Sequence, residues 1–158
     1  FIPDKNLGAY IQSLVPEKKI ILFEGYCYVH NRIREDEIQK TKEKFPNAKV
    51  VVHPEAPMAV IKTADEVLST SGMLRYVSES SATEFIVATE QGLLERMSRE
   101  NPGKSFYPAY RPKICSNMKR TALIDVYHAL NEKKYQIEID PDVSNKAVSA
   151  LNEMIKYI

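Results

Sequence analysis

The chain has 158 residues and a net charge of +1, with 44% hydrophobic and 27% charged residues. This composition is typical of a globular protein, and it lacks the basic excess of a nucleic-acid-binding domain. No apolar run approaches the roughly 20 residues that cross a bilayer. The sequence begins at Phe1 without a Met or a signal-peptide pattern. We therefore expect the C-terminal part of a longer chain or a processed product.

Only two cysteines are present, Cys27 and Cys115, which lie 88 residues apart. Such sparse cysteines favour free or metal-bound thiols in a reducing compartment over a disulfide framework. We therefore expect a cytoplasmic location. A single disulfide between Cys27 and Cys115 is the alternative.

Short apolar runs alternate with stretches of helical pattern along the chain. Apolar runs that are continuous rather than alternating predict parallel strands buried on both faces. In chain order we expect a strand at 1–2, a helix at 6–14, strand 20–23, helix 35–45, strand 50–52, helices 57–64 and 71–77, strand 85–88, helix 91–99, strand 106–107 and helix 119–130.

The last predicted helix follows Asp140 and runs to Ile158. Asp140 is a suitable N-cap and Pro141 a suitable first helical residue. Apolar residues then recur along one face, which predicts a packing helix that closes the fold.

Strands that alternate with helices predict an α/β fold with short parallel sheets covered by helices on both faces. A weak internal repeat is also visible: each copy reads strand, helix, strand, cysteine loop, helix. This repeat predicts two α/β units. The unit at 1–83 carries Cys27 and the His-Pro-Glu motif, and the unit at 84–158 carries Cys115 and the last helix.

Each cysteine follows a predicted strand, and ligands gather at the carboxyl ends of strands in open α/β sheets. His30 lies three residues after Cys27, and Cys115 precedes a helix start, where free N–H groups favour a thiolate. Both cysteines are therefore candidate metal ligands, although a small buried hydrophobe is the plainer interpretation. Two thiolates do not complete an iron–sulfur site, which normally takes four.

His53-Pro54-Glu55 ends the apolar run at 50–52. An imidazole held beside a carboxylate suits proton transfer near pH 7. The alternative is an ordinary strand end, with His53 bonded to a carbonyl.

Ser69 and Thr70 open a predicted helix. Hydroxyls at a helix N-terminus can bind phosphate or carboxylate. Taken by itself, this motif favours a plain N-cap.

Five segments together resemble the quinolinate synthase family in order and spacing. They are Pro3-Asp4-Lys5-Asn6-Leu7-Gly8, Gly25-Tyr26-Cys27-Tyr28-Val29-His30, Val52-His53-Pro54-Glu55, Ser69-Thr70-Ser71-Gly72-Met73 and Cys115-Ser116-Asn117-Met118-Lys119. The resemblance covers the whole chain but only about the C-terminal half of the family.

The resemblance implies repeated three-layer α/β/α units with pseudo-threefold symmetry in the complete protein, and one cysteine from each unit on a 4Fe–4S cluster with one open iron. It also implies condensation of iminoaspartate with dihydroxyacetone phosphate to quinolinate in NAD biosynthesis, a transferase reaction. Carried over by position, the resemblance implies that Cys27 and Cys115 are metal ligands. It implies that the catalytic residues are His30, His53 and Glu55, and that the substrate-binding residues are His53, Glu55, Ser69 and Thr70.

The third cysteine of the family is absent from this chain. We therefore expect these residues to be catalytically incomplete without an N-terminal fragment or partner chain. One alternative is a non-catalytic α/β module that binds a small carboxylate or phosphate. Another is a zinc site formed by Cys27, His30 and Cys115.

Overall fold

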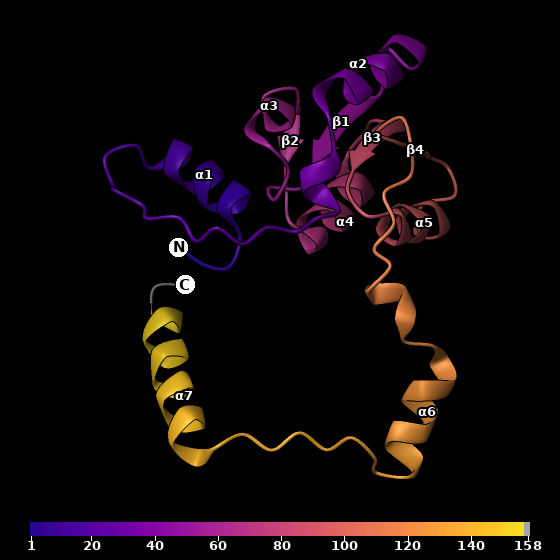
Figure 1. The fold of residues 1–158 in the computed structure, drawn as a ribbon. Helices are drawn as coiled ribbons and strands as arrows, with labels where there is room; N and C mark the ends of the chain where they lie inside the picture. The colour runs from indigo at the N-terminus through magenta and orange to yellow at the C-terminus, as the bar shows by residue number, and fades with distance from the viewer. Residues whose placement is uncertain (157–158) are drawn as a thin grey trace. The chain divides into compact units, whose positions relative to one another are not determined.

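The computed structural model describes residues 1–156, and the chain divides into two compact units, Phe1–Cys115 and Ser116–Ile158. The first unit is built on a four-stranded, all-parallel sheet (Figure 1). In spatial order its strands are β2 (Glu66–Val67), β1 (Lys49–Val52), β3 (Glu84–Ala88) and β4 (Ser105–Pro108). The α/β class is as predicted, and β1, β3 and β4 lie at three of the predicted runs. The edge strand β2 was missed, because two residues are too few to show a pattern.

The two central strands are buried on both faces, which explains their continuous apolar runs. Val50 and Val52 of β1 join Ile86 of β3 in one core cluster, whereas Val51 joins Val87 in the other. Successive side chains of a strand point to opposite faces. Both faces of this short sheet therefore need a helical layer.

Helices cover both faces of the sheet and complete three layers (Figure 1). One core cluster packs residues of α2 (Glu35–Lys44) and α3 (Met58–Ile61) on the sheet, and α1 (Lys5–Leu14) contacts α3. The other packs α4 (Thr70–Glu79) and α5 (Gln91–Glu100) on the opposite face. Of the predicted helices, 57–64 is the one that is clearly shorter. Its end tightens into turns in which the Thr63 and Ala64 amides bond three residues back.

The strands predicted at 1–2 and 20–23 do not form. The two segments do lie side by side, since the Phe23 amide donates to the Phe1 carbonyl (3.0 Å) and the Phe1 amino group donates to the Ile21 carbonyl (2.6 Å). No other described strand extends this pair, and Ile21 is 76% exposed. Two strands with so few bonds are marginal as a sheet, so the segments stay irregular.

The second unit holds a 3₁₀ turn at Met118–Arg120 and the helices α6 (Leu123–Asn131) and α7 (Pro141–Ile155). The single helix predicted at 119–130 is therefore wrong at its start. Thr121 is extended, and the Asp125 carboxylate accepts the Ala122 amide (2.7 Å), so a new helix begins there.

The start of α7 is as predicted. The Asp140 carboxylate accepts the amides of Asp142 (2.9 Å) and Val143 (3.2 Å). None of its described residues is buried, and the packing of this helix on the rest of the fold stays a prediction. Ile158 lies outside the described residues.

The predicted boundary between residues 83 and 84 falls inside the first unit, between α4 and β3. The interpretation of two repeated α/β units stays a prediction. Among the described helices, none has the length and apolar character needed to cross a bilayer.

Candidate functional site

The carboxyl edge of the sheet gathers most of the candidate residues. His53 follows β1, and its amide donates to the Ala88 carbonyl (3.2 Å), which extends the ladder with β3. Thr89 and Glu90 follow β3 directly. Because parallel strands end at the same edge, residues far apart in the sequence meet there.

His53, Pro54 and Glu55 form a tight turn. The Ala56 amide donates to the His53 carbonyl (2.9 Å), and Pro54 restrains the backbone between them. The Glu55 amide donates to Nδ1 of His53 (3.3 Å). Nδ1 is therefore an acceptor, and the neutral ring carries its proton on Nε2.

His30 connects this turn to β3. Its Nδ1 bonds to the Glu55 carboxylate (2.9 Å), and its Nε2 bonds to the Thr89 hydroxyl (3.0 Å). A carboxylate only accepts, so Nδ1 donates to Glu55 and Nε2 accepts from Thr89. The rings of His30 and His53 are stacked, with centroids 4.1 Å apart and planes 9° apart. The three predicted catalytic residues thus form one contiguous group.

Both histidines are buried and favour the neutral state. Burial lowers the pKa of His30, and the carboxylates of Asp4 and Glu90 offset part of this lowering. Burial is also the largest cause for His53, and with the charge of His30 it lowers the pKa to about 4 against the opposing effects of Glu55 and Asp4. Two stacked, desolvated imidazoles are poor places for positive charge.

The lowered pKa of His53 predicts a pH dependence of stability. An unfolded histidine titrates near pH 6.5, so above that pH neither state binds the proton. Between about pH 6.5 and pH 4 the unfolded chain binds a proton that the folded chain does not. The free energy of unfolding therefore falls as the pH is lowered through this range. We expect a loss of about 2 kcal/mol between pH 6.5 and pH 5 from this residue. Urea titrations of the metal-free chain and its His53→Gln variant measure it. Equal pH slopes in both would contradict the prediction.

Cys27 lies against the same group. One ligand atom each of Cys27, His30 and Glu55 lies within 4.8 Å of the other two, so these residues could hold one metal ion. The zinc alternative combined Cys27 and His30 with Cys115. In the structure the third member of the group is Glu55, and Cys115 is not part of it.

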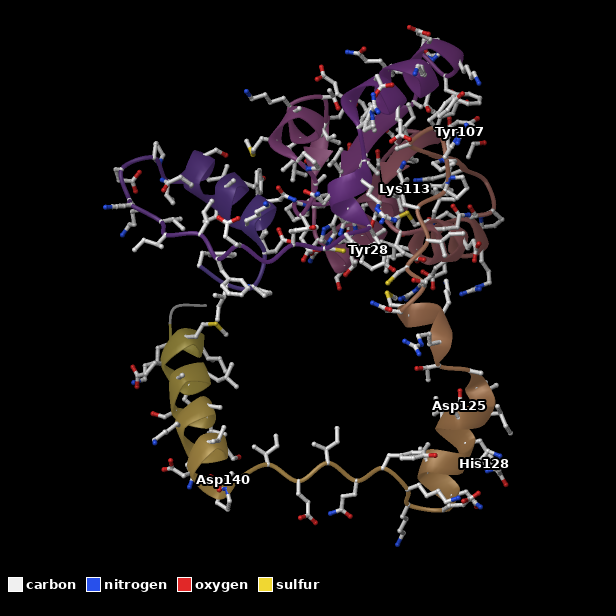
Figure 2. All side chains as sticks on the ribbon, viewed as in Figure 1. Tyr28, Tyr107, Lys113, Asp125, His128 and Asp140 are labelled. Carbon is white, nitrogen blue, oxygen red and sulfur yellow. The ribbon has the colours of Figure 1, made fainter. Side chains whose placement is uncertain are left out.

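Cys115 lies on a second loop that touches the first. The Tyr28 hydroxyl bonds to the Cys115 sulfur at 3.6 Å. Tyr28 and Lys113 of the Cys115 loop, both labelled in Figure 2, line one small pocket. Both cysteines are free and half-buried, so the disulfide alternative is not formed. The structure thus brings the loops of the two predicted metal ligands together.

Ser69 and Thr70 lie at the same edge of the sheet, after β2, with no bond to the histidine group among the described residues. The Ser69 hydroxyl accepts the Gly72 amide (3.3 Å) and so caps α4. Both side chains are exposed. The cap is the local role that the sequence pattern favoured.

Substitutions at Ser69 and Thr70 separate the cap from substrate binding. We expect Ser69→Ala to cost about 1 kcal/mol of stability through the lost cap. Thr70→Val keeps the cap and removes only a hydroxyl. If that hydroxyl binds a substrate anion, KM rises about 10- to 100-fold, as for a hydrogen bond to a charged group. Steady-state kinetics of this chain together with the N-terminal part expected from the sequence test this, and an unchanged KM for both variants would leave Ser69 as a cap alone.

Three buried polar residues of this site were not predicted: Asp4, Thr89 and Glu90. Thr89 and Glu90 had a signal, because they follow the clearest apolar run and ligands gather at strand ends. Asp4 lies in the first of the five family segments, but its residue type and position before a predicted helix indicate only a cap. Its contact with the Cys27 loop depends on the fold.

The fold and the site define an α/β protein with an imidazole, carboxylate and thiol centre at the carboxyl edge of a parallel sheet. The family model described as "Quinolinate synthetase A protein" matches residues 1–156. Quinolinate synthases of Thermodesulfovibrio yellowstonii and Alkaliphilus metalliredigens are 46% and 44% identical over 100% and 99% of this chain. A third, from Methanoregula boonei, is 43% identical over 98%.

This chain belongs to the quinolinate synthetase A family. It spans about half the length of the curated relatives it matches, 52%, 52% and 51% of the three named above. The sequence resemblance is thereby confirmed.

Proposed function

We propose that this chain contributes the His-Pro-Glu part of the active site of a quinolinate synthase. The reaction joins iminoaspartate and dihydroxyacetone phosphate to quinolinate, with loss of water and phosphate, in the cytoplasm. The observation that carries the proposal is the contiguous group of His30, His53 and Glu55 against Cys27. A further region that supplies a third cysteine completes the enzyme. We call this chain together with that region the assembled protein.

The cysteines fit the proposed 4Fe–4S cluster as two of its ligands. Cys27 and Cys115 are free thiols on two loops of one unit that touch through Tyr28. Thiolates are the normal ligands of such clusters. When bound, the cluster supplies a Lewis-acidic iron that polarises substrate oxygen or nitrogen groups.

We assign His53 the role of a neutral hydrogen-bond donor. Its Nε2 has no hydrogen-bond partner among the described residues, and 11% of the side chain is exposed. A pKa of about 4 keeps the ring neutral at pH 7. Such a ring can polarise a substrate carbonyl or carboxylate without bringing in charge.

Glu55 and His30 then serve as the proton-moving pair. The Thr89 hydroxyl fixes the tautomer of His30, which in turn donates to the Glu55 carboxylate. The carboxylate is a quarter exposed, so it can take a proton from a bound substrate. In this proposal Ser69 and Thr70, at the start of α4, bind the substrate phosphate or carboxylates.

Anaerobic reconstitution of the assembled protein tests this function. We expect about four irons per protein, lost in both Cys27→Ser and Cys115→Ser. His128→Ala is the control, since His128 lies in the second unit and bonds to Glu132 (2.7 Å). If the unsubstituted protein binds no iron and forms no quinolinate, the proposal fails, and the alternative of a carboxylate- or phosphate-binding module takes its place.

A further inference from the structure

The backbone amide of Cys27 is held by the capping residue of a helix. Asp4 is buried, and one of its oxygens accepts the Leu7 amide (2.9 Å) at the start of α1. The other oxygen accepts the Cys27 amide (2.7 Å). A second bond runs beside it, from the Lys5 amide to the Gly25 carbonyl (2.8 Å).

The same arrangement recurs at Cys115. Glu90 is buried, and one of its oxygens accepts the Gly92 amide (2.6 Å) at the start of α5. The other accepts the Cys115 amide (3.2 Å). The parallel bond runs from the Gln91 amide to the Lys113 carbonyl (2.8 Å).

The two arrangements match except in the cap, where Asp4 accepts the amide three residues on and Glu90 the amide two residues on. In each, a buried carboxylate caps a helix and binds the amide of a cysteine, while the next residue binds the carbonyl two residues before that cysteine. We call each one a carboxylate clamp: Asp4 with Cys27, and Glu90 with Cys115. The cap alone does not require a carboxylate, because the Ser69 hydroxyl caps α4. Binding the cysteine amide in addition to capping the helix requires a second acceptor oxygen, which a carboxylate supplies.

We propose that Asp4 and Glu90 are positioning residues that hold Cys27 and Cys115 for metal binding. The metal-binding part rests on the proposed function, whereas the clamp itself does not. Each carboxylate links a cysteine loop to the N-terminus of a helix of the first unit, α1 for Asp4 and α5 for Glu90. The cysteine backbone is therefore fixed before a metal binds. Groups that orient metal ligands in this way typically contribute 10- to 100-fold in metal affinity.

Asp4→Asn and Glu90→Gln isolate the clamp from the cap. An amide keeps one acceptor oxygen, and asparagine is itself a good N-cap, so the helix start is retained. The other position becomes an NH₂ group, which cannot accept from the cysteine amide. Asp65→Asn is the matched control, because Asp65 accepts the Val50 amide (2.7 Å) in the same unit without contacting a cysteine.

Two readouts are measured on these variants. The first is amide hydrogen exchange in the metal-free chain, where we expect Asp4→Asn to speed exchange selectively at Cys27 and Glu90→Gln selectively at Cys115. The second is the rate at which a chelator removes iron from the assembled protein, which we expect to rise about 10- to 100-fold in both variants and not in Asp65→Asn.

The outcomes separate the inference from the proposed function. Unchanged exchange at the cysteine amides, or faster exchange spread over the whole first unit, would overturn the clamp. Selective exchange with unchanged iron release would overturn its role in metal binding. If the unsubstituted assembled protein takes up no iron, the proposed function fails, and the exchange rates alone decide whether the carboxylates hold the cysteine loops.

Discussion

We expect His53→Ala to lower the turnover of the assembled protein by about 10²-fold or more while its iron content stays unchanged. The loss of one preorganised donor to a developing oxyanion costs about 10²–10³ in kcat, and the loss of general acid–base help costs a similar factor. His53 is well placed for this effect because its Nδ1 is held by the Glu55 amide (3.3 Å) and its ring stacks on His30.

Three measurements distinguish the catalytic role of His53 from a structural one. Iron content and the far-UV circular dichroism spectrum should match the unsubstituted protein, and kcat should fall more than KM rises. His128→Ala is again the control and should leave turnover unchanged. Full turnover in His53→Ala would remove this residue from the mechanism.

The second large effect is expected at the ion pair between Glu37 of α2 and Lys113. The Lys113 ammonium lies 2.7 and 2.8 Å from the two carboxylate oxygens of Glu37, and the side chains are only 14% and 13% exposed. Removing one partner of such a pair leaves a buried charge without compensation. We therefore expect Glu37→Gln to cost about 3–5 kcal/mol of unfolding free energy. Urea denaturation of the metal-free chain measures this cost.

The double variant Glu37→Gln/Lys113→Met tests the cause. Replacing both charges with uncharged side chains of similar size should recover most of the loss, since the desolvation cost disappears with them. Glu100→Gln is the control, because its pair with Arg96 is about half exposed and should contribute less than about 1 kcal/mol. A cost for Glu37→Gln as small as that of the control would show that Lys113 finds water or another partner.

The sheet and its layers could be read from local pattern. The runs at 50–52 and 85–88 are continuous because β1 and β3 are buried on both faces, and burial on both faces requires helices on both sides. The runs at 1–2 and 20–23 look alike in sequence but form no sheet. A strand exists only where a neighbour pairs with it, and pairing is not encoded in a run of three or four residues.

The candidate site shows the same division. Cys27, His30, His53 and Glu55 were found because their residue types and loop positions are chemically informative by themselves. The stacking of the two rings and the low pKa of His53 could not be predicted, since burial and distance set both. Likewise, the spacing of Asp4 and Cys27 in the sequence does not show that the Asp4 carboxylate accepts the Cys27 amide.

The sequence by itself determined the α/β class, the family, the buried central strands and the identity of the candidate ligands and proton carriers. These properties depend on residue type and short-range periodicity, which are complete in the sequence. Only the tertiary structure decided that the three catalytic candidates form one contiguous group, that Cys115 stays outside the group of Cys27, His30 and Glu55, and that matching carboxylates hold both cysteine loops. The contacts that define them join residues 23 to 25 positions apart, a separation at which local sequence pattern carries no information.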